Sequence, residues 1–345
     1  MKVLPITKAF LKYVWRKSGA YRVQANRTGS FVLSYHRVKP LDGSLIDKRL
    51  GAISPSCLER TLSMLRDLGF RFISSDELSQ LSDESRKAVC ITFDDGLRDV
   101  VDFALPILRR YRAPSTVFLI TSTVDRQDLL WQHRLYESID RLPVTECLKY
   151  LPAFGQLADK DAFACRVVRE LGRIELEEAA LALANAAGMS ARDEMNLAGR
   201  LYLREKDLDL MNRNEMVVAG HSHEHWPASK HTAKELQADY HACMTALSQL
   251  SDRPAFQFGV PFGDVSNGCV SLAKKVGFFD VYISEGFLSP VDGRAFPRVW
   301  PHESLDDFAL VLSRQFRRRS EDLASLKARY LRGISQNSEL LAAQS

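Results

Sequence analysis

The chain has 345 residues, enough for one large α/β domain or two ordinary ones. Its hydrophobic fraction of 46% and charged fraction of 26% are typical of a folded globular protein and exclude a largely disordered chain. The formal net charge of +4 is too small to indicate nucleic-acid binding, so we expect no nucleic-acid partner.

The first 27 residues are basic, because they carry seven Lys and Arg side chains and no acid. Such an arm, residues 1–28, fits either peripheral contact with a membrane surface or a solvated segment on the protein body. Lysines interrupt every apolar window that could act as a secretion signal, and no segment reaches the length of a membrane span. We therefore expect a cytoplasmic protein that can associate with the inner face of the membrane.

Short runs of strand-forming residues recur along the chain, and most are followed by a helical pattern. We expect strands at 31–35, 88–93, 115–121, 216–219, 255–260 and 280–284. One helix follows Ser56 and ends before Gly69, and another begins at a capping box formed by Thr232 and Glu235. This alternation predicts an α/β domain with a largely parallel sheet over residues 29–303.

The stretch from about 126 to 207 has a different pattern. It is charged, rich in Ala, Leu and Glu, and lacks a good strand, so we expect a helical insertion between two strands of the sheet. A structural buttress is the commoner role for such an insertion, and a cover over the active site is the other. Beyond Ser304, which can cap a last helix, a basic helical tail is expected over residues 304–345.

The strand at 88–93 ends in two adjacent carboxylates, Asp94 and Asp95, followed by Gly96. Ligands bind at the carboxyl ends of parallel strands in folds of this class. Two neighbouring acids repel each other, and keeping both ionised at a buried strand end is costly unless a cation or a proton is shared. A bound metal ion would remove this conflict, whereas the alternative is an N-capping pair for a helix that starts at Leu97.

Three of the eight histidines of the chain lie within five positions, at His221, His223 and His225, directly after the strand at 216–219. Neutral imidazole is a common zinc ligand, and two imidazoles with one carboxylate leave a coordination position open for water. A surface histidine cluster is the alternative. Spacing alone leaves open whether His221 acts with His225 or with His223.

Together these two segments resemble the polysaccharide deacetylase family, also called NodB-homology or carbohydrate esterase family 4. Its first motif, Thr-Phe-Asp-Asp-Gly, stands unchanged at residues 92–96, and its second, His-Ser/Thr-x-x-His, stands at residues 221–225. For the fold, the resemblance implies a distorted, incomplete (β/α)7 barrel that carries the helical insertion.

The resemblance also implies roles for the residues of both motifs. Asp95, His221 and His225 would ligate one divalent metal ion, and Asp94 would be the general base. Zinc is the first choice from the ligand types, although cobalt, nickel, manganese or iron could occupy the same set.

A third stretch, residues 258–264, is similar to the family motif in which proline precedes an aromatic residue and glycine. In the family the backbone N–H of the aromatic position helps to stabilise the oxyanion, a role that Phe262, preceded by Pro261, could fill. The sequence departs from the family at Gly259, where an arginine usually orients the base. Arg298 is the candidate replacement, and a surface or sheet-edge arginine is the alternative reading.

The last motif of the family places a histidine after a short apolar strand near the C-terminus, and His302 is a poor match to it. Residues 31–36 have the required form near the N-terminus instead. Some deacetylases that act on biofilm polysaccharides are similar in carrying this element first, as a circular permutation. His36 is therefore the candidate general acid, and a buried structural histidine is the alternative.

The function implied is that of a hydrolase. A metal-dependent deacetylase would remove an N-acyl group, first of all N-acetyl, from an amino sugar in a polysaccharide or in its lipid- or nucleotide-linked precursor. Because the usual arginine is missing, an inactive carbohydrate-binding protein on a deacetylase scaffold is one alternative. A hydrolase of a small non-sugar amide is another, and the sequence leaves the oligomeric state open.

Overall fold

The computed structural model describes residues 30–81, 87–155, 159–251, 253–284 and 295–301. Residues 30–301 form one compact unit, and all elements discussed below belong to it. The basic N-terminal arm, His302 and the tail expected over 304–345 lie outside the described residues. No helix in the described ranges is both long enough and apolar enough to cross a bilayer.

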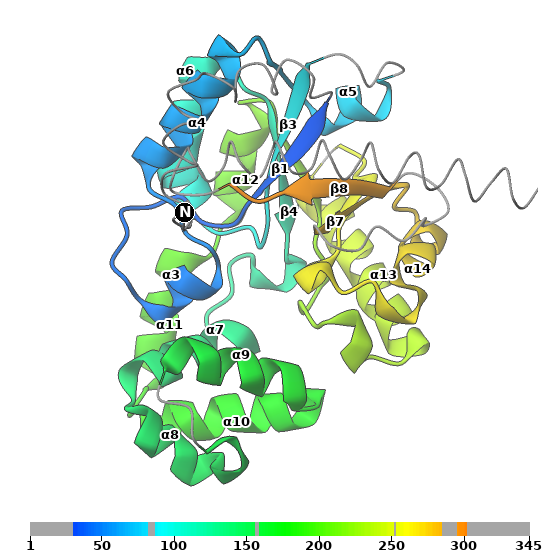
Figure 1. Cartoon of the computed structure of the whole chain (residues 1–345). Helices are drawn as coiled ribbons and strands as arrows, with labels where there is room; N and C mark the ends of the chain where they lie inside the picture. Colours follow the sequence, from blue (N-terminus) through cyan, green and yellow to red (C-terminus); the bar gives the residue numbers. More distant parts are fainter. Residues whose placement is uncertain (1–29, 82–86, 156–158, 252, 285–294, 302–345) are drawn as a thin grey trace, which may run out of the picture. The chain divides into compact units, whose positions relative to one another are not determined.

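A parallel sheet forms the centre of this unit (Figure 1). Its strands are β1 (Phe31–Tyr35), β2 (Arg71–Ile73), β3 (Ala88–Phe93), β4 (Ser115–Leu119), β5 (Met216–Gly220), β6 (Gln257–Gly259), β7 (Asp280–Ser284) and β8 (Ala295–Val299). Strand β1 pairs with both β3 and β8, so seven strands form a ring in the order β1, β3, β4, β5, β6, β7, β8.

The ring is distorted at two places. Strand β2 lies outside the ring. It shares one edge of β3 with β4: β2 pairs with residues 88–90 of β3, and β4 pairs with residues 91–93. Among the described residues, β5 and β6 share only the pair Gly220 and Phe258. The expected α/β class and the distorted (β/α)7 barrel are thereby confirmed.

Helices surround the barrel because each connection between parallel strands must cross a face of the sheet. They are α3 (Leu45–Arg49), α4 (Pro55–Asp67), α5 (Ser75–Ser79), η1 (Val100–Ala104) continuing into α6 (Leu105–Tyr111), α12 (Glu205–Asn212), α13 (Ala233–Leu250) and α14 (Cys269–Val276). The capping box of Thr232 and Glu235 is present at the start of α13. Helix α4 begins earlier than expected, because Ser54 rather than Ser56 caps it and Pro55 occupies its first turn.

The stretch between β4 and β5 is helical, as expected. It contains α7 (Trp131–Arg141), α8 (Val144–Tyr150), α9 (Lys160–Glu170), α10 (Arg173–Ala186) and α11 (Ala191–Leu201), drawn in green in Figure 1. These helices share a buried apolar cluster that includes Leu135, Phe163 and Leu183, and the cluster continues to Leu97 and Trp226 on loops of the barrel. The insertion is therefore packed onto the end of the barrel where those loops lie.

Candidate active site

The candidate site residues singled out in the sequence gather at the carboxyl ends of the strands. Asp95 follows β3, His221 follows β5, Phe262 follows β6 and His36 follows β1. Parallel strands end at the same edge of a barrel, so segments far apart in the chain are brought together there. Arg298, from β8, is the fifth member of this group.

The backbone at this end of the barrel is strained. Asp95, Ser222, His225 and Phe262 have φ angles of 71°, 64°, 55° and 57°, in the left-handed region that favours glycine. Such conformations cost about 1–3 kcal/mol each and persist where the surroundings hold them. Most of these strained residues lie in the motifs at 92–96 and 221–225. This indicates that the conformation of these loops serves function rather than stability.

Asp95, His221 and His225 meet as a buried triad. The Nε2 atoms of His221 and His225 lie 3.5 and 3.3 Å from Asp95 Oδ1, and one potential ligand atom from each residue lies within 4.8 Å of the other two. His221 Nδ1 donates to the carbonyl oxygen of Gly259 at 2.7 Å, and His225 Nδ1 donates to Gln132 Oε1 at 2.7 Å. These acceptors place the ring protons on Nδ1, so both Nε2 lone pairs are available to a cation.

The chemistry of the triad fits a divalent metal ion. Both carboxylate oxygens of Asp95 are buried and have no hydrogen-bond partner among the described residues, and an unpaired buried charge is costly. Burial raises the pKa of Asp95, but His225 and His221 more than offset it, so the pKa lies below its usual range. Burial also lowers the pKa of His225 to about 3, which keeps its imidazole neutral, as a metal ligand must be.

Two alternative readings of these motifs are wrong. The histidines are not a surface cluster, because His221 and His225 are only 1% and 3% exposed. The aspartates are not a capping pair either, because the helical segment after Gly96 starts at η1, where Asp99 stands at the N-cap and makes no side-chain cap bond. His223 lies outside the triad, with its Nδ1 2.9 Å from Thr121 Oγ1.

Asp94 lies beside the triad, and a polar side chain donates a hydrogen bond to each of its two carboxylate oxygens. Arg298 Nη1 donates to Asp94 Oδ1 at 2.5 Å, while Ser34 Oγ donates to Oδ2 at 3.4 Å. Burial alone would raise the pKa of Asp94, but the charge of Arg298 and the hydrogen bond from it help to hold that pKa below its usual value. Asp94 is therefore ionised and oriented.

Arg298 is fully buried, so the surface and sheet-edge readings of this residue are wrong. Its guanidinium carbon lies 5.2 Å from the centre of the Phe118 ring. A Cβ atom at Gly259 would come within 2.8 Å of that same ring and 3.0 Å of His221 Nδ1. The structure thus explains why Gly259 carries no side chain, and it places an arginine beside Asp94 from another strand.

His36 faces Asp94 from the end of β1. Its Nε2 lies 3.7 Å from Asp94 Oδ2, and its side chain keeps 14% exposure. The ring stacks on Trp300, with centroids 4.6 Å apart, and Nδ1 is buried without a hydrogen-bond partner among the described residues. His36 is thus partly exposed to solvent, and one of its two ring nitrogens lacks a hydrogen bond among the described residues. A structural histidine in the core would be fully hydrogen-bonded.

Phe262 lies beside His225 of the triad. The residue is 41% exposed and its ring centroid lies 4.7 Å from that of His225, while Pro261 before it is buried. The residue is thus partly exposed, with a left-handed backbone, next to one of the two histidines of the triad.

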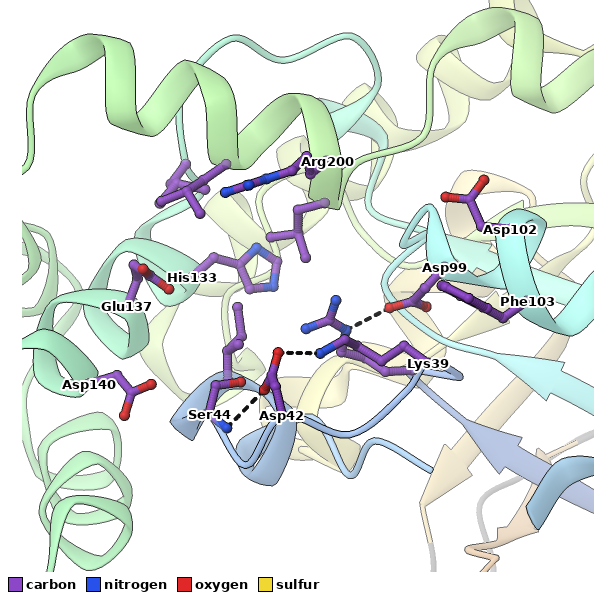
Figure 2. Close-up of a pocket in the computed structure, with 15 residues that line it drawn as sticks. Lys39, Asp42, Ser44, Asp99, Asp102, Phe103, His133, Glu137, Asp140 and Arg200 are labelled. Atoms are coloured by element: carbon purple, nitrogen blue, oxygen red, sulfur yellow. Dashed lines mark hydrogen bonds and ion pairs between the residues drawn. The ribbon is translucent and has the colours of Figure 1, made fainter. Parts of the chain in front are cut away.

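A cavity of about 520 Å³ lies next to these loops, between the barrel and the insertion (Figure 2). Arg37 and Lys39 reach it from the loop after β1, and His133 reaches it from α7. At the wall of this cavity, Arg37 bonds to Asp99 at 2.7 Å and also to Asp47 at 2.9 Å. The triad residues are not among those lining it, so this cavity is separate from the candidate metal site.

Sequence reasoning missed three residues of the site. Gln132 supports His225, Ser34 supports Asp94, and Trp300 stacks on His36. Ser34 lies in the strand that was expected to lead to His36, so the alternation of side chains along that strand was a usable signal. A single glutamine at the start of an insertion helix and a lone tryptophan after β8 carry no pattern of their own.

Known proteins resemble the chain in sequence and in fold. A family model for polysaccharide deacetylases matches residues 82–280, more than half of the chain. The Bacillus subtilis (strain 168) protein named "Putative polysaccharide deacetylase YxkH" is 27% identical over 110 residues, which is 31% of this chain and 37% of that relative. The match therefore spans well under two thirds of that relative's length.

Solved structures share the barrel. The Streptococcus pyogenes deacetylase PplD in complex with acetate is 15% identical, with a TM-score of 0.52 over 82% of this chain and 97% of its own. The IcaB structure from Ammonifex degensii is 18% identical, with a TM-score of 0.53 over 83% and 97% of the two chains. At these identities the likeness concerns the fold alone.

Proposed function

Because the chain belongs to the polysaccharide deacetylase family, a family of amide-bond hydrolases, we propose that it hydrolyses the N-acetyl group of an amino sugar with the help of a divalent metal ion. The observation that carries this proposal is the meeting of Asp94 with the triad of Asp95, His221 and His225 at one end of the barrel. The substrate we propose is a saccharide chain or its lipid- or nucleotide-linked precursor.

Asp95 and the Nε2 atoms of His221 and His225 would hold the ion. When bound there, it would supply Lewis acidity, polarising a water molecule and the carbonyl oxygen of the acyl group. Zinc is the metal we propose from the donor set, and cobalt, nickel, manganese and iron are the other candidates. Elemental analysis of protein purified without a chelator or a nickel column distinguishes them.

Asp94 would act as the general base. Its lowered pKa keeps it ionised, so it can accept a proton from water as the oxygen of that water adds to the carbonyl carbon. Arg298 and Ser34 would fix the direction in which the carboxylate points. Positioning of this kind matters because a base must lie within hydrogen-bond reach of the proton that it removes.

His36 and Phe262 would act on the acyl group and the leaving amine. The N–H of Phe262 would donate to the oxygen that becomes negative in the transition state. As the C–N bond breaks, His36 Nε2 would give a proton to the amine nitrogen, releasing acetate and the free amino sugar. His36 then regains a proton from Asp94, 3.7 Å away, which restores both groups.

The experiment is a substrate panel with metal-loaded protein. Release of acetate is measured from N-acetylglucosamine oligomers, from a lipid-linked and a nucleotide-linked N-acetylhexosamine, and from N-acetylated amino acids as non-sugar amides. We expect release from at least one saccharide and none from the amino acids. Release from the amino acids alone would favour the small-amide hydrolase, and saccharide binding without any release would favour the inactive carbohydrate-binding protein.

A location at the inner face of the membrane is a further part of the proposal, supported by the basic composition of residues 1–28. The measurement is co-sedimentation with vesicles of anionic lipid, comparing the full chain with a variant that starts at Gly29. We expect the shorter variant to lose binding, and equal binding of both would contradict this location. Uncharged vesicles serve as the control for lipid charge.

A further inference from the structure

Helix α7 of the insertion begins against the loop that carries the metal-ligating histidines. The Trp131 indole N–H donates to the carbonyl oxygen of Glu224 at 3.3 Å, and its ring stacks on Trp226 with centroids 4.1 Å apart and planes 5° apart. These two contacts fix the loop on both sides of His225. The first turn of α7 and the histidine loop are therefore a single packed unit.

The next residue of α7 contacts the ligand itself. Gln132 is 2% exposed, and its Oε1 accepts the hydrogen bond from His225 Nδ1 at 2.7 Å. His133 bonds instead to the Tyr202 hydroxyl at 2.8 Å and is directed toward the cavity, as Figure 2 shows. Gln132 is thus the one residue of this turn that reaches into the metal triad.

The two histidine ligands are supported differently. His221 donates to a backbone carbonyl, which can only accept, so its tautomer does not depend on any side chain. His225 depends on an amide, which can accept through oxygen or donate through nitrogen. If the amide donated, the ring proton would move to Nε2 and face Asp95, where it would block metal binding. His225 also holds a left-handed φ of 55°, so it needs an external support.

We propose that Gln132 is a positioning residue of the metal centre, and that through it the helical insertion sets the affinity of the barrel for its ion. This inference rests on the proposed metal site. The amide oxygen holds the His225 ring in place and keeps its proton on Nδ1. Partners of this kind typically change metal affinity by 10- to 100-fold when they are removed.

The experiment measures Zn²⁺ affinity by competition with a chromophoric chelator, on the full chain. Gln132→Leu removes the acceptor while keeping a similar volume, and Gln132→Glu keeps an acceptor that cannot donate. The matched control is Gln127→Leu, because Gln127 is exposed and its side chain bonds only to the Asp125 carbonyl among the described residues. Thermal unfolding of the metal-free variants and the visible spectrum of the Co²⁺ forms are recorded alongside.

We expect Gln132→Leu to bind Zn²⁺ 10- to 100-fold more weakly and to shift the Co²⁺ bands. Gln132→Glu and Gln127→Leu should stay within about threefold of the wild type. Unchanged affinity in Gln132→Leu, or an equal loss in the Leu and Glu variants, would overturn the inference while leaving the proposed function intact. Wild-type protein that binds no Zn²⁺ at the triad would overturn both.

Discussion

Arg298 Nη1 donates to Asp94 Oδ1 inside the barrel, and the side chains of this pair are 0% and 3% exposed. The bond joins β8 to the end of β3, which are not neighbours in the ring. Removing one partner of a buried pair leaves an uncompensated charge, so the bond has consequences for both stability and acidity.

Arg298→Met should therefore lower the free energy of unfolding by about 3–5 kcal/mol. It should also move the acidic limb of the kcat/KM profile to higher pH. Arg298 helps to hold the pKa of Asp94 below its usual value, so removing the arginine raises that pKa. As the pH falls, the base is then protonated at a higher pH than in the wild type.

Denaturant unfolding and a pH profile check both effects. In the double variant with Asp94→Asn, the buried charge is removed and much of the lost stability should return without activity. Arg98→Met is a matched control, since Arg98 is partly exposed and pairs with Asp102 on the surface. An acidic limb that stays in place in Arg298→Met would show that the arginine does not set the acidity of the base.

Asp94→Asn should lower turnover by about 10²–10⁴-fold, because asparagine cannot take the proton from water. Its metal content should equal that of the wild type, since Asp94 lies outside the triad. His221→Ala should lose both metal and turnover. His223→Ala is the control for the latter, because His223 lies in the same loop but outside the triad, and it should keep both.

His36→Gln should separate substrates by their leaving group. Loss of the acid should slow hydrolysis of an N-acetyl amide by about 10²–10⁴-fold. An activated ester such as 4-nitrophenyl acetate should be affected far less, because its leaving phenolate needs no proton. Steady-state assays measure the turnover of both substrates. An equal loss of turnover on the amide and on the ester would argue against the role of His36 as an acid.

Gly259→Ala should disturb the first histidine ligand. The new Cβ would meet the Phe118 ring at 2.8 Å and His221 Nδ1 at 3.0 Å, so one of them must move. Overpacking of this kind costs about 1–3 kcal/mol, and we expect weaker Zn²⁺ binding as well. Gly199→Ala is the control, because a Cβ there meets nothing within 4 Å. Equal Zn²⁺ affinity in the two variants would contradict the expectation.

The sequence predicts the triad well because its residues sit in contiguous motifs at strand ends. It does not by itself choose between His223 and His225, since that choice depends on the backbone. Strand β5 ends at Gly220 and Ser222 turns with a positive φ, so the alternation of a strand does not continue through the loop. Family resemblance supplied the choice that spacing could not.

Other parts of the structure carry no local signal. Strand β8 was not predicted because Pro297 interrupts it and cannot donate to a ladder, yet Pro297 pairs in register with Ile283. Strand β2 has three residues, too few for a pattern. Gln132 acts through tertiary contact alone, so the link between insertion and metal site appears only once the chain is folded.

The position of β1 between β8 and β3 has a consequence for biosynthesis. While the chain is emerging from the ribosome, β1 has β3 to pair with, but its other edge stays open until β8 has been synthesised. His36, Asp94 and Arg298 lie on these three segments, so closure of the barrel and completion of the acid–base apparatus belong to one late, non-local folding event. A nascent protein would thus acquire hydrolytic competence only when its architecture is finished.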